Sequence, residues 1–268
     1  MDPRLQRRVQ RYGWDKAASH YDRGWQRQLA PAQARLLALA DLRAGERVLD
    51  IACGTGVVTF AAAAAVGTTG SVLGTDLSDE MIRIARERSP GAHVRFERMD
   101  AEQLAAGDAS FDAALCALGL MYVPDPGRAV GEMRRVAGRA VAAVWGARKR
   151  CGWADIFPIV DARVRSEVCP LFFALGTGDS LRALFEEAGF TDLVGERIDA
   201  TLVYDSGDEA CDAAFAGGPV ALAYSRFDDT VRREVRAEYL ASIAGYRDGE
   251  GYRVPGEFVV VAGRAAAR

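Results

Sequence analysis

The segment from Arg47 to Trp145 constrains the fold more than any other part of the chain, because short apolar stretches alternate there with helix-like stretches. Strands are expected at residues 47–52, 71–76, 93–98, 111–117 and 139–145, and helices at 57–66, 78–88 and 127–136. This alternation is typical of βαβ units, and the continuous apolar character of the strands indicates burial on both faces. The pattern predicts an α/β protein with a doubly wound, parallel sheet.

Composition excludes several other classes of protein. The chain has 268 residues, of which 50% are apolar and 26% charged, so neither a disordered nor a collagen-like chain fits. A net charge of -3 gives the whole protein no electrostatic preference for nucleic acid or an anionic membrane. No apolar run approaches the ~20 residues that span a bilayer. The start of the chain is polar and Arg-rich, unlike a secretory signal, so a cytoplasmic location is expected.

Cysteine and histidine offer little metal or redox chemistry. The five cysteines are odd in number and none forms a Cys-x-x-Cys pair, so neither a zinc ribbon nor a disulfide framework is expected. The only two histidines are His20 and His93. No metal site is predicted.

A glycine-rich turn at Gly54–Gly56 follows the first strand of this region and precedes a helix. The free N–H groups of a helix N-terminus attract an anion, and glycines let a ligand approach the backbone. Asp76 ends the next strand, where its carboxylate can accept both hydroxyls of a ribose. This geometry suits any adenosine-containing cofactor, including nicotinamide and flavin dinucleotides. The third glycine of a dinucleotide fingerprint is replaced by Thr59, which disfavours a pyrophosphate.

Further motifs follow in register. The glycine turn reads Asp50-x-x-Cys-Gly-x-Gly, with an acidic residue four positions before the first glycine, and three more motifs stand at residues 74–81, 99–102 and 110–116. With these motifs the chain resembles the class I S-adenosylmethionine-dependent methyltransferases, in the small-molecule branch that includes the quinone-biosynthesis enzymes. The resemblance covers about residues 15–145. It implies a Rossmann-like, seven-stranded, mostly parallel sheet, with residues 193–204 as strand six and residues 258–265 as an antiparallel last strand.

The resemblance also implies roles for individual residues toward S-adenosylmethionine. Asp76 would accept the ribose hydroxyls, while Leu77 and Met81 would lie near the adenine. Asp100 would accept a hydrogen bond from the exocyclic amine, and the backbone of Ala101 would donate one.

The remaining expected contacts lie around the glycine turn and the methionine end of the cofactor. The turn would contribute Gly54, Thr55 and Gly56. Tyr21 and the backbone carbonyl of Cys116 would lie near the methionine end. For Asp50 two readings stay open: contact with the amino group of the cofactor, or a hydrogen bond that supports the glycine turn.

Catalysis is less well defined by the sequence. Many relatives carry a histidine near the position of Met121 or Tyr122, and a Leu-x-Pro-Gly-Gly turn before strand five; this chain has neither. His20, Tyr21 and Tyr122 are the candidates for a general base, although His20 equally fits a surface histidine. A base is needed only where the acceptor is a hydroxyl or an acidic carbon, because methyl transfer depends chiefly on positioning the acceptor in line.

The surplus of chain outside the motifs predicts a helical cap. The expected organisation is an N-terminal helical lid at 1–35, a cofactor-binding core at 36–146, a cap insertion at 147–178, a core continuation at 179–204, a second cap insertion at 205–257 and a closing strand at 258–268. The first 35 residues contain eight basic and three acidic residues, which fits either a solvated face or a lid that attracts an acidic ligand. Both insertions are expected to roof the pocket beyond the strand ends.

The sequence therefore predicts a methyltransferase that acts on a small, largely apolar metabolite by O-, N- or C-methylation. The alternative is a protein that binds S-adenosylmethionine, or an enzyme that uses it, without methyl transfer. A nucleic-acid methyltransferase is disfavoured by the acidic body and by the lack of an Asn/Asp-Pro-Pro-Tyr/Phe motif. A nicotinamide oxidoreductase is the second choice on motif grounds. A homodimer is left open.

Overall fold

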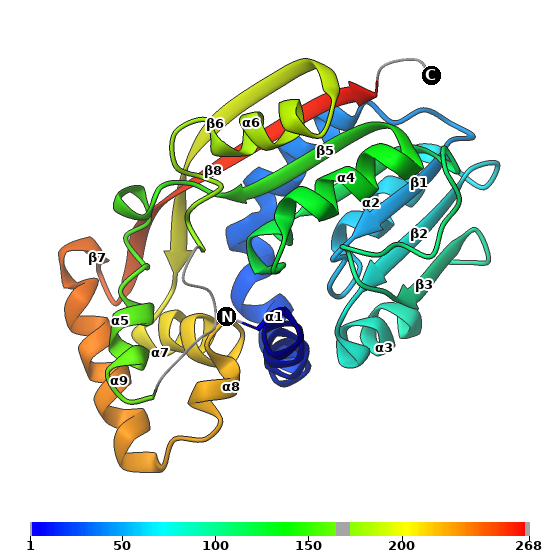
Figure 1. The fold of residues 1–268 in the computed structure, drawn as a ribbon. Helices are drawn as coiled ribbons and strands as arrows, with labels where there is room; N and C mark the ends of the chain where they lie inside the picture. The colour runs from blue at the N-terminus through cyan, green and yellow to red at the C-terminus, as the bar shows by residue number, and fades with distance from the viewer. Residues whose placement is uncertain (1, 165–171, 266–268) are drawn as a thin grey trace.

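A single twisted sheet forms the centre of the computed structural model, which describes residues 2–164 and 172–265. The strands lie in the order β3-β2-β1-β4-β5-β8-β6, with the short β7 paired to β8 (Figure 1). Their bounds are β1 (Arg47–Ile51), β2 (Ser71–Asp76), β3 (Val94–Arg98), β4 (Phe111–Ala117), β5 (Ala137–Trp145), β6 (Phe190–Tyr204), β7 (Arg247–Asp248) and β8 (Gly251–Ala265).

The topology confirms the predicted mostly parallel sheet. The strands β3, β2, β1, β4 and β5 pair in parallel, and β8 runs antiparallel to both of its long neighbours, β5 and β6. Two details differ from expectation. The two-residue strand β7 adds an eighth member, and β8 begins at Gly251 rather than at Phe258. Glycines and Pro255 lower the strand propensity of this stretch, but pairing with β6 overrides it.

Helices cover the sheet from both sides. Figure 1 shows α4 and α6 in front of the sheet, while α1 passes behind it. Ser78 caps the helix expected from residue 78, because its Oγ accepts a hydrogen bond from the Met81 N–H of α3 at 3.2 Å. The flanking helices are α1 (Pro3–Ala40), α2 (Val57–Val66), α3 (Asp79–Glu87), α4 (Pro126–Val136) and α6 (Ser180–Glu187).

The N-terminal segment is one helix of 38 residues, α1, which begins at an Asp2 cap and extends past the predicted boundary at residue 35. Its second half is held in the core by the buried residues Leu29, Leu36 and Ala40. Gln28 ties it to β6, because its amide donates to the Val203 carbonyl and accepts from the Val203 N–H. The first half of α1 extends away from this anchor.

The cap consists of short helices beyond the end of the long β6–β8 ribbon: α5 (Ile156–Asp161), α7 (Gly207–Cys211), the π-helix η3 (Asp212–Ala216), α8 (Ala221–Tyr224) and α9 (Asp229–Ser242). The π-helix η3 follows α7 directly, and Gly217, Gly218 and Pro219 separate it from α8. Between residues 153 and 164 the chain forms the helix α5; residues 165–171, Cys169 among them, lie outside the described residues.

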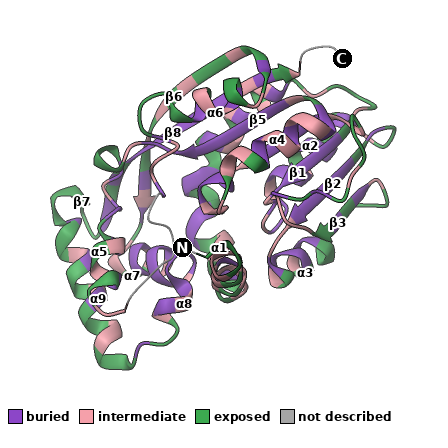
Figure 2. Cartoon of the chain, viewed as in Figure 1, coloured by how far each residue is buried: buried purple, intermediate pink, exposed green. Residues whose placement is uncertain are grey.

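The hydrophobic core continues from the sheet into the cap, as the buried residues of Figure 2 show. Trp145 at the end of β5 packs on Trp153 and on Phe258 of β8, with ring centroids 4.8 and 4.3 Å apart.

Among the helices that the structure describes, none is long and apolar enough to cross a membrane. The remaining short helical turns are η1 (Leu120–Tyr122), η2 (Arg148–Arg150) and η4 (Ala244–Tyr246).

Candidate functional site

A cavity lies at the carboxyl ends of the parallel strands, the edge at which ligands bind in open α/β sheets. The cavity is partly open to solvent, and its interior together with the open solvent at its mouth amounts to about 980 Å³. The floor comes from the strand ends and the loops that follow them: Ala52, Gly54, Asp76, Leu77, Met81, Met99, Asp100, Ala101, Ala117, Leu118, Gly119 and Trp145. The roof comes from α1, the loop around η1 and the cap: Arg7, Gln10, Trp14, Tyr21, Trp25, Leu29, Tyr122, Val123, Pro124, Trp153 and Pro219.

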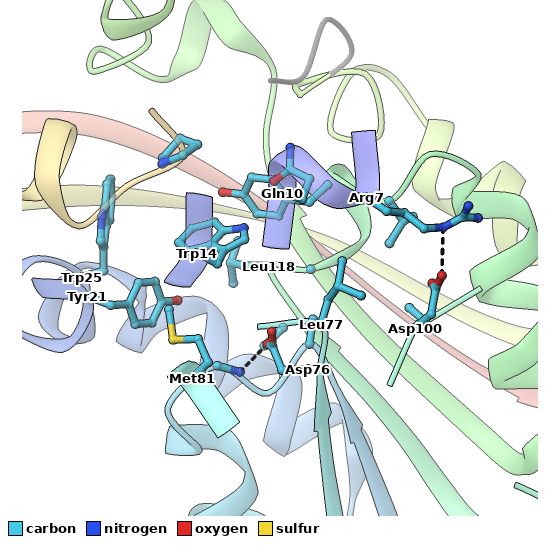
Figure 3. A pocket seen from close by; sticks show the side chains of 18 of the residues that line it. Arg7, Gln10, Trp14, Tyr21, Trp25, Asp76, Leu77, Met81, Asp100 and Leu118 are labelled. Atoms are coloured by element: carbon cyan, nitrogen blue, oxygen red, sulfur yellow. Dashed lines mark hydrogen bonds and ion pairs between the residues drawn. The ribbon is translucent and has the colours of Figure 1, made fainter. Parts of the chain in front are cut away.

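The carboxylate of Asp76 lies at the centre of the floor, as Figure 3 shows. Its Oδ2 accepts a hydrogen bond from the Gly54 N–H and its Oδ1 accepts one from the Ser78 N–H, both at 2.9 Å. Burial raises the pKa of Asp76, while these N–H donors oppose the rise. Each carboxylate oxygen can accept more than one hydrogen bond, so capacity remains for hydroxyl donors from a ligand. The arrangement fits a ribose diol.

The loops after β2 and β3, with the first turn of α3, bring the expected adenine-binding residues to the cavity. Leu77, Met81, Asp100 and Ala101 all line it. Two apolar side chains and one carboxylate fit a flat heteroaromatic ring with an exocyclic amine, which needs apolar contact on its faces and an acceptor at its edge. Their direct contact with adenine stays a prediction.

Asp50 is buried outside the cavity lining, with 1% of its surface exposed. Its Oδ2 accepts a hydrogen bond from Thr59 Oγ1 of α2 at 2.6 Å, and its Oδ1 is buried with no partner among the described residues. Desolvation raises the pKa of this carboxyl to about 7. The sequence left two interpretations of Asp50 open, contact with the cofactor's amino group or a hydrogen bond to the glycine turn, and neither includes this hydrogen bond to α2. Contact with the cofactor's amino group stays a prediction.

This raised pKa gives a testable pH dependence. In the unfolded chain the pKa of Asp50 is near 4, the ordinary value for aspartate. Between about pH 4 and 7 the unfolded chain therefore binds fewer protons than the folded protein. The free energy of unfolding of the cofactor-free protein therefore falls as pH rises through that range. We expect Asp50→Asn to be more stable than the unmodified protein at pH 8 by up to about 4 kcal/mol, and to lose this advantage at pH 4.5. Urea unfolding of both proteins at pH 8 and pH 4.5 measures the difference in their free energies of unfolding. The same difference at both pH values would contradict the prediction.

The other expected residues near the glycine turn support the site from behind. Thr55 Oγ1 donates to Asp22 of α1 at 2.5 Å. Gly56 caps α2 with a φ of 93°, a left-handed conformation that disfavours side chains. Cys116 is buried, and desolvation raises the pKa of its thiol to about 12, so the thiol is not a nucleophile at neutral pH. The cavity lining contains none of these three residues.

The three candidate bases fall into two groups. Tyr21 and Tyr122 both line the cavity and contact Trp14, with ring centroids 5.7 and 5.0 Å from it. His20 is exposed and lies on another side of α1, in a surface depression with Arg23 and residues 205–212. Neighbouring helix residues point about 100° apart, and of these two only Tyr21 lines the cavity.

Tyr21 is a hydrogen-bond donor rather than a base at neutral pH. Burial strongly raises the pKa of its hydroxyl, and the nearby carboxylates of Asp22 and Asp76 raise it further. The protonated hydroxyl can orient an acceptor, whereas removing its proton is costly. Catalytic roles for all three candidates stay predictions.

Sequence reasoning predicted an N-terminal helical lid and named Tyr21, but it did not identify Arg7, Gln10, Trp14 and Trp25 of α1 as lining residues. Arg7, Gln10, Trp14, Tyr21 and Trp25 are spaced at intervals of three, four and seven, which places them on one stripe of the helix. This spacing is visible in the sequence, but the direction in which the stripe faces is not. Figure 3 shows the stripe above the strand ends.

Trp25 is fixed by the cap. Its indole Nε1 donates to the Ala213 carbonyl of the π-helix η3 at 3.0 Å. The neighbouring Gly24 allows this approach, because a Cβ at that position would lie 2.9 Å from Ala213 Cα. The π-helix therefore holds one wall of the cavity in place.

The fold is similar to that of solved methyltransferase structures. Residues 48–139 match the family model described as a methyltransferase domain. Over 107 residues the chain is 42% identical to the ubiquinone/menaquinone biosynthesis C-methyltransferase UbiE of Burkholderia mallei strain SAVP1; the match covers 39% of this chain and 44% of that protein. The chain thus matches less than half the length of this curated relative.

Solved structures support the same fold. The YcgJ protein of Bacillus subtilis has a TM-score of 0.61 and 19% identity, covering 89% of this chain and 100% of that one. Phosphoethanolamine N-methyltransferase 2 of Haemonchus contortus, solved with phosphomonomethylethanolamine and S-adenosylhomocysteine, has a TM-score of 0.57 and 16% identity, covering 88% of this chain and 53% of that one.

The resemblance predicted from the sequence is confirmed: residues 48–139 match a methyltransferase domain, and the chain is similar over 107 residues to a quinone-biosynthesis C-methyltransferase.

Proposed function

We propose that this protein uses S-adenosylmethionine to methylate a small, largely apolar molecule on oxygen, nitrogen or carbon. The observation that carries the proposal is the cavity itself. One part presents Asp76 and Asp100 to the polar groups of a nucleoside, and another is walled by aromatic rings. The sulfonium of the cofactor supplies an activated methyl group, and its carbon–sulfur electron pair stays on sulfur when the acceptor's lone pair or carbanion attacks the methyl carbon.

The aromatic walls support an apolar acceptor. Trp25, Trp145 and Trp153 contact one another with ring centroids 4.8–5.9 Å apart, and all three line the cavity. Rings locked against each other in this way keep their shape without a ligand, exclude water and hold a flat acceptor in one orientation. The hydroxyls of Tyr21 and Tyr122 supply polar contacts that can align a heteroatom toward the methyl group.

The first test is cofactor binding. We expect S-adenosylmethionine and S-adenosylhomocysteine to bind the purified protein in calorimetry with one site per chain, and NAD⁺ not to bind. Binding of NAD⁺ alone would favour the oxidoreductase, and binding of no nucleoside would contradict the proposal.

The second test separates methyl transfer from cofactor use without transfer. The protein is incubated with methyl-labelled S-adenosylmethionine and a panel of flat apolar acceptors, including hydroquinones. We expect label in at least one acceptor, with stoichiometric S-adenosylhomocysteine. Consumption of an acceptor without label transfer would instead favour the non-methylating alternative. A homodimer and a cytoplasmic location stay predictions.

A further inference from the structure

The first half of α1 is tied to the loops of the cofactor site by polar contacts. Asp15 Oδ1 accepts hydrogen bonds from Ser78 Oγ at 2.6 Å and from the Glu80 N–H at 3.2 Å. Arg11 forms an ion pair with Asp79 at the start of α3. These contacts involve residues outside the cavity lining, so they hold the helix without reaching a ligand.

Arg7 differs from these residues because it lines the cavity and also forms an ion pair with a predicted adenine-binding residue. Its Nε lies 2.8 Å from Asp100 Oδ2, the contact drawn as a dashed line in Figure 3. Sequence reasoning assigned no role to Arg7.

A buried carboxylate fixes the position of Arg7. Glu102 is 1% exposed, and its Oε2 accepts from Arg7 Nε at 2.7 Å and from the second guanidinium nitrogen, Nη2. Its Oε1 accepts from the Asp125 N–H at 2.5 Å, so the loop before α4 also holds it. A carboxylate buried in this way requires a cationic partner, which makes the position of Arg7 well defined.

Asp100 is therefore held from two sides. Its Oδ1 accepts from the Glu102 N–H at 2.9 Å, and its Oδ2 lies against Arg7. The carboxylate cannot rotate without breaking one of these contacts.

We propose that Arg7 is a positioning residue that sets the selectivity of the site for adenine, by fixing the Asp100 carboxylate as the acceptor for the exocyclic amine. The inference rests on the proposed function. Hypoxanthine carries a carbonyl oxygen in place of that amine. A fixed carboxylate repels this oxygen, whereas a carboxylate free to rotate can turn away from it. Arg7 Nε and Nη2 pair with the two carboxylates, and a guanidinium has no acceptor, so of this pair only Asp100 can accept a hydrogen bond from the amine.

The test compares Arg7→Met with Arg11→Met. Methionine keeps much of the apolar stem and removes the charge, and the control removes an ion pair from the same helix outside the cavity. The ligands are S-adenosylhomocysteine and S-inosylhomocysteine, measured by calorimetry. We expect Arg7→Met to weaken S-adenosylhomocysteine binding about tenfold and to reduce the preference over S-inosylhomocysteine at least threefold; Arg11→Met should change both by less than twofold.

The preference between the two ligands is the decisive measurement, because general loosening of α1 weakens both equally. Equal losses for both ligands, equal effects of the two substitutions, or no preference in the unmodified protein would each overturn the proposal. Arg7→Lys is expected to restore part of the preference, since it returns the charge without the planar fork. If the unmodified protein binds neither ligand, the proposed function itself fails; the Arg7 proposal alone fails if binding is normal and selectivity is unaffected.

Discussion

Replacing Asp76 with alanine is expected to weaken S-adenosylhomocysteine binding at least about 100-fold. A charged acceptor contributes about 1.5–3 kcal/mol for each hydrogen bond, and the ribose offers two hydroxyls. The substitution also frees the Gly54 and Ser78 N–H groups that the carboxylate now holds, so the glycine turn loses its support. Calorimetry on the purified variant measures the loss.

Two companion variants make this result specific. Asp76→Asn keeps the size of the side chain and one acceptor oxygen, so it should bind more tightly than the alanine variant and more weakly than the unmodified protein. Asp79→Asn, three residues further on, removes a half-exposed carboxylate that does not line the cavity, and should change binding by less than twofold. Unchanged binding in Asp76→Ala would remove the ribose role from this residue.

The second large effect is expected on stability, at Trp153. Its side chain is 1% exposed and contacts Trp25, Trp145, Phe157, Phe172 and Phe173. Truncation to alanine leaves a cavity where the sheet meets the cap, and should lower the free energy of unfolding by about 3–5 kcal/mol. Urea unfolding measures this change, and the Michaelis constant for the methyl acceptor should rise as one wall of the pocket is lost.

A milder substitution at the same position separates packing from polarity. Trp153 Nε1 is buried without a hydrogen-bond partner among the described residues. Phenylalanine removes this unsatisfied donor along with part of the ring, so Trp153→Phe should cost less than half as much as Trp153→Ala. Trp14→Ala serves as a control, because this ring is only partly buried. If Trp153→Ala lowers the free energy of unfolding by less than about 1 kcal/mol, the cap does not unfold together with the sheet.

Sequence alone was sufficient for the parts of this protein that depend on local pattern. The strands of the core were predictable because burial on both faces leaves an uninterrupted apolar run, and Ser78 was predictable as a cap because its side chain bonds within its own helix. Asp76 was found because it ends a strand that is adjacent to the glycine turn in any parallel sheet of this kind.

The remaining features depend on contacts between distant parts of the chain. Arg7 reaches Asp100 across more than ninety residues, and no local pattern indicates which face of α1 meets the strand ends. The extension of β8 depends on β6, since pairing between the two stabilises a stretch whose own propensity for strand is low. His20 was a candidate because it precedes Tyr21 and because histidine is a common general base, but nothing local showed that it lies in a surface depression outside the cavity lining; its catalytic role stays a prediction.

The position of β8 has a consequence for how the protein is made. This strand is the last of the sheet in the sequence, yet it lies between β5 and β6. During synthesis β5 and β6 are both complete before their common neighbour emerges, so each exposes an unpaired edge for the time needed to translate the intervening residues. Unpaired edges are where chains associate incorrectly. A ribosome that pauses before residue 251 would prolong that exposure.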